Sequence, residues 1–124
     1  MNDQERLALG RQKFAECYGD VLSLPEKFDE NGYVGFTLKS LFSDIFGRPG
    51  LSLRDRRLII LGALAGLGAD PSLYEIHVKS ALGNKELTPE ELREVVLTTL
   101  PYCGFPRTSP LYPLVEKCIA NSAK

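Results

Sequence analysis

Several features that would point to a function are scarce or missing in this sequence. Its 15 Lys and Arg residues are balanced by 16 Asp and Glu residues, so it lacks the cationic excess typical of proteins that bind nucleic acid or anionic lipid. The longest apolar run covers residues 58–69, well short of the roughly 20 residues that cross a bilayer. We therefore expect neither nucleic acid nor a membrane as a partner.

Cysteine and histidine are also scarce. Cys17, Cys103 and Cys118 are an odd number at wide spacings and form no C-x-x-C pair, and no charged-then-apolar leader follows Met1, which favours a reducing cytoplasm. His77 is the one histidine, too little for the three or four ligands of a zinc site. No glycine-rich phosphate loop or nucleophile elbow is present either. We expect no metal and no cofactor.

The apolar residues that are present recur at helical spacing, and no segment alternates like a strand. With 124 residues and 44 % hydrophobic composition, the chain has the size of one domain, so we expect a single domain over residues 1–124. The fold class is all-α with about six helices. They are expected at about 3–18, 33–45, 53–65, 71–83, 89–100 and from 110 onward.

Start and stop signals support several of these boundaries. Asp70 before Pro71 is typical of a helix start, and so is Thr88 with Glu91 three residues later, a capping box. Pro101 is expected to end the fifth helix. Within the third helix, Gly62 and Gly66 predict a close approach of a neighbouring backbone, although Gly66 equally fits an ordinary glycine at a helix end.

Few residues are candidates for chemistry. His77 can move protons near neutral pH, but a lone histidine beside an apolar stripe also fits a packed core residue. Asp44 lies among apolar residues, where a partly buried carboxylate can act as an acid or base; the alternative is a solvent-facing aspartate. Arg48, Arg54, Arg56 and Arg57 are clustered, as at a solvated helix start, an interface or a site for a substrate carboxylate.

Taken together, these motifs resemble the carboxymuconolactone decarboxylase family. The resembling residues run through nearly the whole chain: Glu5, Arg6, Gly10, Gly19-Asp20, the stretch 44–51, Arg56, His77, Ala81, Thr88-Pro89-Glu90-Glu91 and the stretch 102–106. The block around Arg48-Pro49-Gly50-Leu51, combined with Thr-Pro-Glu-Glu and Tyr-Cys-Gly-x-Pro, makes the resemblance specific.

The resemblance implies a fold similar to the alkylhydroperoxidase D proteins, small helical subunits that assemble as trimers or hexamers. In that redox branch a C-x-x-C pair precedes the histidine, whereas Asp70 and Leu73 fill those positions here. The chain therefore resembles the decarboxylase branch. That branch removes carbon dioxide from γ-carboxymuconolactone in aromatic catabolism and needs no cofactor.

On this resemblance, His77 is the leading acid/base candidate and Asp44, where the family usually has Glu, is the second. Arg48 and Arg56 match family arginines that would hold substrate carboxylates. The sequence departs from the pattern at residues 21–25, where the family's decarboxylases commonly have His-Val-Asp-Arg, and Phe42 and Phe46 replace Trp. These changes allow another small carboxylated lactone or acid as substrate.

Three functions thus stay open. The first is a cofactor-free lyase acting on a small carboxylated lactone, as a homo-oligomer. The second is a peroxidase-like thiol oxidoreductase, for which Cys103 is a candidate thiol although the missing C-x-x-C argues against it. The third is a helical oligomer without catalysis.

Overall fold

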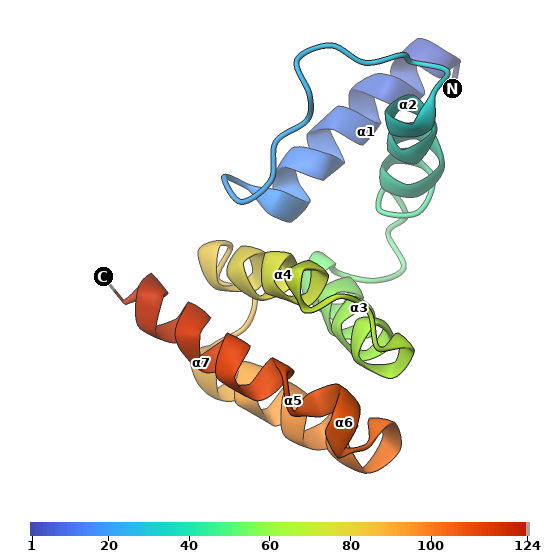
Figure 1. The fold of residues 1–124 in the computed structure, drawn as a ribbon. Coiled ribbons are helices and arrows are strands. Elements are labelled where there is room, and N and C mark those ends of the chain that lie inside the picture. The colour runs from blue at the N-terminus through green and yellow to red at the C-terminus, as the bar shows by residue number, and fades with distance from the viewer. Residues whose placement is uncertain (124) are drawn as a thin grey trace. The chain divides into compact units, whose positions relative to one another are not determined.

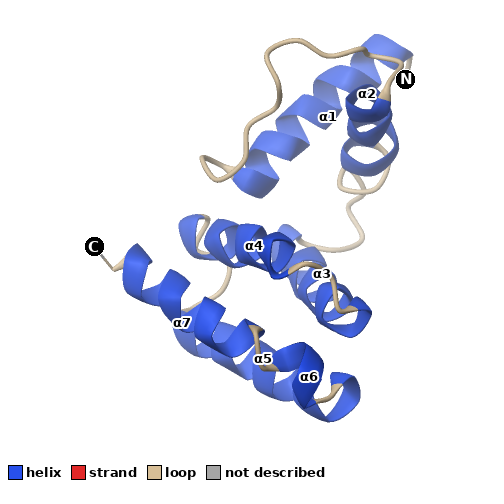
Figure 2. Cartoon of the chain, in the orientation of Figure 1, coloured by secondary structure: helices blue, strands red, loops and turns tan. Residues whose placement is uncertain are grey.

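The computed structural model describes residues 1–123, and within them it is all-α, as the sequence predicts (Figure 2). The chain divides into two compact units, Met1–Ser52 and Leu53–Lys124, which are described separately below. The expectation of a single domain over residues 1–124 stays a prediction. None of the described helices is long and apolar enough to cross a membrane.

The first unit contains α1 (Asp3–Tyr18), α2 (Tyr33–Thr37) and the π-helix η1 (Leu38–Ser43). The predicted bounds of α1 are confirmed, and Asn2 caps it by accepting from the Glu5 N–H. The sequence predicts one continuous helix over residues 33–45, but its second half is a π-helix. There the N–H groups of Asp44 and Phe46 donate to carbonyls five residues earlier, which is the hydrogen-bond pattern of a π-helix.

Helix α1 packs along η1 (Figure 1), and a glycine makes their close approach possible. A Cβ at Gly10 would lie 2.3 Å from the carbonyl oxygen of Leu38, closer than any side chain allows. Farther along α1, Phe14 and Tyr18 pack against Phe42 of η1 at ring-centroid distances of 5.1 and 5.9 Å. Phe42 also stacks on Phe46, so these two phenylalanines, where the resemblance leads us to expect Trp, belong to an aromatic cluster of this unit.

The second unit contains five helices, whose arrangement can be followed in Figure 1. They are α3 (Leu53–Leu67), α4 (Pro71–Gly83), α5 (Pro89–Cys103), α6 (Phe105–Thr108) and α7 (Leu111–Ser122). Helix α3 contacts both α4 and α5, and α7 packs on the same two helices. Their shared core is apolar and includes Leu61, Val78, Leu92 and Val115. This core holds α4, which carries His77, against α3.

The predicted starts of α4 and α5 are confirmed. Asp70 accepts from the Ser72 N–H at 2.9 Å, and the capping box of Thr88 and Glu91 is complete. The expectation that Pro101 ends α5 is wrong, because the helix continues to Cys103. A proline in the last turn removes one N–H donor, and the Gly104 N–H still bonds the Leu100 carbonyl.

The expected close approach at Gly62 and Gly66 is also wrong. Nothing lies within 4 Å of a Cβ placed at Gly62, and at Gly66 the nearest neighbour is the Cys103 sulfur at 3.9 Å. No backbone approaches either position, so the spacing of these two glycines has no packing role. In the first unit, by contrast, backbone carbonyls approach Gly10, Gly35 and Gly47 closely.

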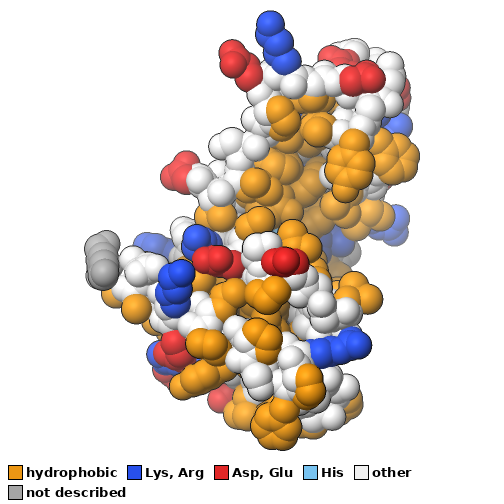
Figure 3. Space-filling view, viewed as in Figure 1, with side chains coloured by type: hydrophobic (Ala, Val, Ile, Leu, Met, Phe, Trp, Pro, Cys, Tyr) orange, Lys and Arg blue, Asp and Glu red, His pale blue; other side chains and the backbone are white. Residues whose placement is uncertain are grey.

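Large hydrophobic side chains also lie on the surface of each unit (Figure 3). In the first unit Tyr33 is 88 % exposed, and in the second unit Tyr102 and Phe105 are 90 % and 70 % exposed. Where such side chains form a contiguous patch, the surface is typical of proteins that associate.

Candidate active site

His77 lies in the middle of α4, on the face that is buried. Tyr74, Val78 and Ala81, at helical spacing around it, are almost completely buried, and His77 itself is 9 % exposed. Because α4 packs against α3, the imidazole meets residues of α3 rather than bulk solvent. The sequence places His77 there through the Asp70–Pro71 start, which fixes the register of the helix.

The partner of His77 on α3 is Arg57, which has no exposed surface. Its Nη1 lies 2.8 Å from Nδ1 of His77. The other edge of the guanidinium donates to Glu86 in a bidentate pair, with Nε–Oε1 at 2.8 Å and Nη2–Oε2 at 3.0 Å. The Glu86 side chain is 7 % exposed, so the second unit contains a buried His–Arg–Glu cluster.

The chemistry of the guanidinium assigns the proton on His77. Arginine only donates hydrogen bonds, so Nδ1 of His77 is the acceptor in its contact with Arg57. A neutral imidazole with Nδ1 as acceptor has its proton on Nε2. Protonation of Nδ1 would replace this hydrogen bond with two donors facing each other.

Burial and the positive charge of Arg57 shift the pKa of His77 in the same direction. Desolvation, followed by the positive charge of Arg57, lowers the pKa of His77 to about 4, and the negative charge of Glu86 opposes this in part. The imidazole is therefore neutral at pH 7. Its chemistry in this state is that of an N–H donor at Nε2.

The turn between α4 and α5 brings Glu86 to Arg57. Lys85 has a φ of 56°, a left-handed conformation that directs the chain back toward α3. Arg54, one turn before Arg57 on α3, donates through Nε to the Glu86 carbonyl at 3.1 Å and pairs with Glu91. Asn84 donates to Glu86 Oε2 at 2.9 Å. Arg54 thus binds the backbone carbonyl of Glu86, while Arg57 binds the side-chain carboxylate of Glu86.

Asp44 and Arg48, two of the predicted site residues, belong to the first unit. Asp44 forms a bidentate pair with Arg6, with Oδ2–Nη2 at 2.6 Å and Oδ1–Nε at 3.2 Å, and its side chain is 47 % exposed. The hydrogen bond to Asp44 raises the pKa of Arg6. Arg48 is exposed. The participation of Asp44 and Arg48 in a site with His77 stays a prediction.

The arginine that contacts His77, Arg57, is not among the two predicted from the sequence to hold substrate carboxylates. Arg56, expected to hold a substrate carboxylate, is half-buried, whereas its neighbour Arg57 is buried against His77. Arg57 shares a helical face with Leu61 and Ala65, four and eight residues later, which are also buried. That spacing is the signal that distinguishes the buried Arg57 from the partly buried Arg54 and Arg56.

All three cysteines are free thiols. Cys118 is buried and desolvation raises its pKa, which makes it a poor nucleophile. Cys103 is half-buried and Cys17 is buried in the first unit. Among residues 1–123, no three His, Cys, Asp or Glu side chains are grouped as a metal site would need.

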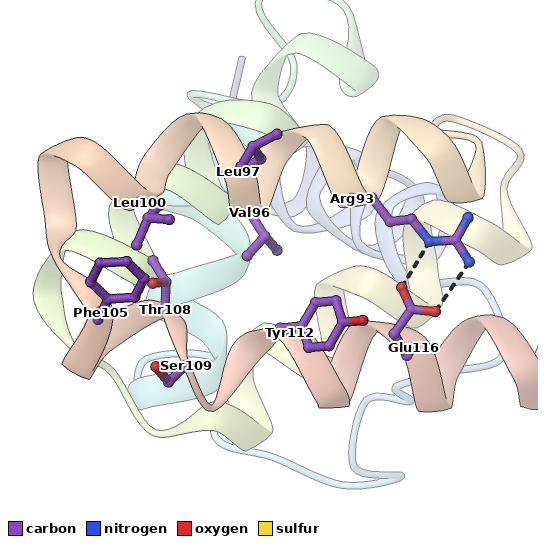
Figure 4. Close-up of a pocket in the computed structure, with 9 residues that line it drawn as sticks. All are labelled: Arg93, Val96, Leu97, Leu100, Phe105, Thr108, Ser109, Tyr112 and Glu116. Atoms are coloured by element: carbon purple, nitrogen blue, oxygen red, sulfur yellow. Dashed lines mark hydrogen bonds and ion pairs between the residues drawn. The ribbon is translucent and has the colours of Figure 1, made fainter.

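A groove of about 610 Å³ lies between α5, α6 and α7 (Figure 4). Its walls are mostly apolar and include Leu97, Phe105 and Tyr112. The charged residues in it, Arg93 and Glu116, bind each other in a bidentate pair, with distances of 2.7 and 3.1 Å. Since these charges neutralise each other and His77 does not line the groove, we place the candidate active site at the His77 cluster.

The fold and this cluster define a small all-α protein with a buried histidine hydrogen-bonded to a buried arginine. A family model, the carboxymuconolactone decarboxylase family, matches residues 35–117, more than half of the chain. The chain belongs to the carboxymuconolactone decarboxylase family, as the sequence motifs predict. The matched range includes Arg57, His77 and Glu86.

Two curated relatives are decarboxylases by name. The chain is 27 % identical over 121 residues to the 4-carboxymuconolactone decarboxylase of Acinetobacter baylyi, which covers 94 % of this chain and 89 % of the relative. It is 35 % identical over 75 residues to a nitrosuccinic acid decarboxylase of Metarhizium robertsii, covering 60 % of this chain and 51 % of the relative. No solved structure matches the chain significantly.

Proposed function

We propose that the protein is a cofactor-independent decarboxylase of γ-carboxymuconolactone or a related small carboxylated lactone or acid, with His77 at the reacting atoms. The observation that carries this proposal is the buried contact between His77 and Arg57 in a chain whose relatives are decarboxylases by name. The bidentate pair with Glu86 holds the Arg57 guanidinium beside the imidazole.

The substrates named for the two relatives share a chemical feature. In an unsaturated lactone, and equally beside a nitro group, the electron pair left by carbon dioxide can move onto an oxygen of the substrate itself. The protein then has to supply orientation and stabilisation of that oxygen's charge. Because the substrate itself accepts the electron pair, no added electron sink is needed. A neutral hydrogen-bond donor such as His77 suits the remaining task of stabilising the charge on that oxygen.

The other roles follow from the family resemblance. We assign Arg48 and Arg56 to the substrate's carboxylates and keep Asp44 as the second acid/base group. We also propose a homo-oligomer, trimer or hexamer, because each unit exposes large apolar side chains such as Tyr33 and Tyr102. Light scattering at micromolar concentration tests this, and a well-folded monomer would contradict it.

The activity is tested by release of carbon dioxide from 4-carboxymuconolactone, nitrosuccinic acid and related small acids, with no metal, flavin or nicotinamide added. We expect release from at least one of them, and a loss of about 10²- to 10³-fold in kcat for His77→Leu. Arg93→Gln is the control, because it breaks a bidentate arginine–glutamate pair of the same unit away from His77. No release from any of these acids would contradict the proposed function, and unchanged turnover in His77→Leu would remove His77 from it.

A further inference from the structure

We propose that His77 acts as a neutral hydrogen-bond donor through Nε2, and that Arg57, held by Glu86, is the positioning residue that fixes this tautomer. The inference rests on the proposed decarboxylase function and assigns the part that the histidine has in it. It replaces proton transfer by His77, as expected from the sequence, with stabilisation of developing charge.

The geometry supports the tautomer from both sides of the guanidinium. One edge of Arg57 donates to Nδ1 of His77 at 2.8 Å, and the opposite edge is bound by both oxygens of Glu86. A guanidinium bound at two points cannot rotate away without losing buried hydrogen bonds. Nδ1 therefore stays an acceptor, and the ring proton stays on Nε2.

The charges that face His77 within its unit favour the same state. Arg57 on α3 disfavours a second positive charge on the ring, and Glu86 in the turn before α5 is already neutralised by Arg57. Lowering of the His77 pKa by burial agrees with this arrangement. A histidine meant to deliver a proton at neutral pH would instead be paired with a carboxylate, which stabilises the imidazolium.

A neutral donor fits the decarboxylation step without a proton leaving His77. The bond between the carboxylate carbon and the substrate breaks, carbon dioxide departs, and the electron pair moves through the unsaturated system onto the lactone oxygen. That oxygen accepts the hydrogen bond from Nε2 as its charge develops. The carbon then takes a proton from water, so that carboxylate and water give product and bicarbonate.

Nitrogen-15 NMR tests the tautomer directly, because His77 is the one histidine in the sequence. In uniformly labelled protein we expect a protonated Nε2 and an unprotonated Nδ1, unchanged from pH 8 to pH 5. A proton on Nδ1, or titration of the ring near its ordinary pKa of about 6.5, would overturn the proposal. This measurement needs no substrate, so its outcome is separate from that of the activity assay.

The role of Arg57 is tested in Arg57→Gln/Glu86→Gln, which removes both charges and leaves neither ion buried alone. We expect the His77 pKa to rise and both tautomers to be populated. Arg93→Gln/Glu116→Gln, which removes a matched bidentate pair, should leave the His77 spectrum as in the parent. Should the first double variant fail to fold, Arg57→Lys replaces it, because it keeps the charge and loses the planar fork. A parent-like His77 spectrum in the folded variant would overturn the positioning role.

Donation is separated from proton transfer by two substitutions of His77 itself. Glutamine reaches a similar position with an N–H donor, whereas leucine has none. We expect kcat to fall about 10²- to 10³-fold in His77→Leu and clearly less in His77→Gln, with little change in KM for either. Equal losses of kcat in the two variants would overturn the donor role.

Discussion

The imidazole of His77 accepts a hydrogen bond of 2.8 Å from the guanidinium of Arg57. Catalytic and metal-binding histidines commonly have the opposite arrangement, in which Nδ1–H donates to a carboxylate or a carbonyl. A carboxylate partner stabilises the imidazolium, whereas a cationic partner opposes it. Glu86, the carboxylate of this cluster, binds the opposite edge of the Arg57 guanidinium. It therefore orients the group that donates the hydrogen bond to His77.

The first prediction concerns the pH dependence of stability. The pKa of His77 is lowered to about 4 in the folded protein, against about 6.5 when unfolded, so between these values the unfolded state binds more protons. The stability that this lowered pKa contributes is fully present above pH 6.5 and is lost as the pH falls toward 4. We expect the free energy of unfolding to drop by at most roughly 2 kcal/mol from this residue between pH 7 and pH 5.

Urea unfolding of the parent and of His77→Gln at both pH values measures this contribution. Glutamine does not titrate, so the variant should lack the His77 part of the slope and retain the part due to carboxylates. Equal slopes in the two proteins would mean that His77 has an ordinary pKa in the folded state, contrary to its burial beside Arg57.

The second prediction compares two glycines in helices. Gly10→Ala places a Cβ against the Leu38 carbonyl, a contact of 2.3 Å that forces α1 away from η1, and we expect a loss of about 1–3 kcal/mol. Gly62→Ala meets nothing within 4 Å and should gain about 0.5–1 kcal/mol, the intrinsic preference of a helix interior for alanine. Thermal unfolding of both variants checks the pair; similar shifts of Tm would contradict it.

These glycines also show the limit of the sequence prediction. Gly62 and Gly66 have the spacing expected for close packing, but spacing does not say which helix lies opposite, and none approaches them. Gly10 has no such pattern around it. The helix starts at Asp70 and Thr88 were predictable because capping depends on side chains within one turn.

The candidate site was predictable only in part. His77 was predicted as the one histidine on an apolar helical face, whereas Arg57 was not predicted as a site residue, although its spacing to the buried Leu61 and Ala65 is recognisable. Glu86 has no comparable signal, because its contact with Arg57 spans 29 residues and depends on the left-handed conformation of Lys85. A long-range pair of this kind is fixed by tertiary packing rather than by local pattern.

The third prediction concerns the buried hydroxyl of Tyr74. Within the part of the chain that the structure describes, this hydroxyl has no hydrogen-bond partner, and burial, followed by the proximity of Cys103, raises the pKa of Tyr74 to about 12. Removing an unsatisfied buried group costs nothing and relieves its desolvation. We expect Tyr74→Phe to match the parent or to be more stable by about 1 kcal/mol in urea unfolding. A clear loss of stability would show that the hydroxyl is hydrogen-bonded in solution.

The last prediction separates the lyase from a thiol oxidoreductase. Asp70 and Leu73 occupy the positions of the redox branch's cysteine pair, Asp70 serves as the cap of α4, and Cys17, Cys103 and Cys118 are all free thiols. A dithiol mechanism requires two cysteines that can form a disulfide within one site. Replacing all three by alanine should therefore leave decarboxylation at the parent's rate. Alanine is chosen over serine because Cys17 and Cys118 are buried, where an added hydroxyl would need a partner.

Stability is expected to fall modestly in this triple variant, through the small cavities left in two cores, so activity is to be compared at a temperature where both proteins are folded. Thiol-dependent peroxide turnover is measured in parallel. Peroxide turnover that is efficient in the parent and absent from the triple variant would reverse the order of the two functions, because only a cysteine can transfer electrons in that reaction. Carbon dioxide release that is equal in both proteins would show that decarboxylation does not depend on the cysteines.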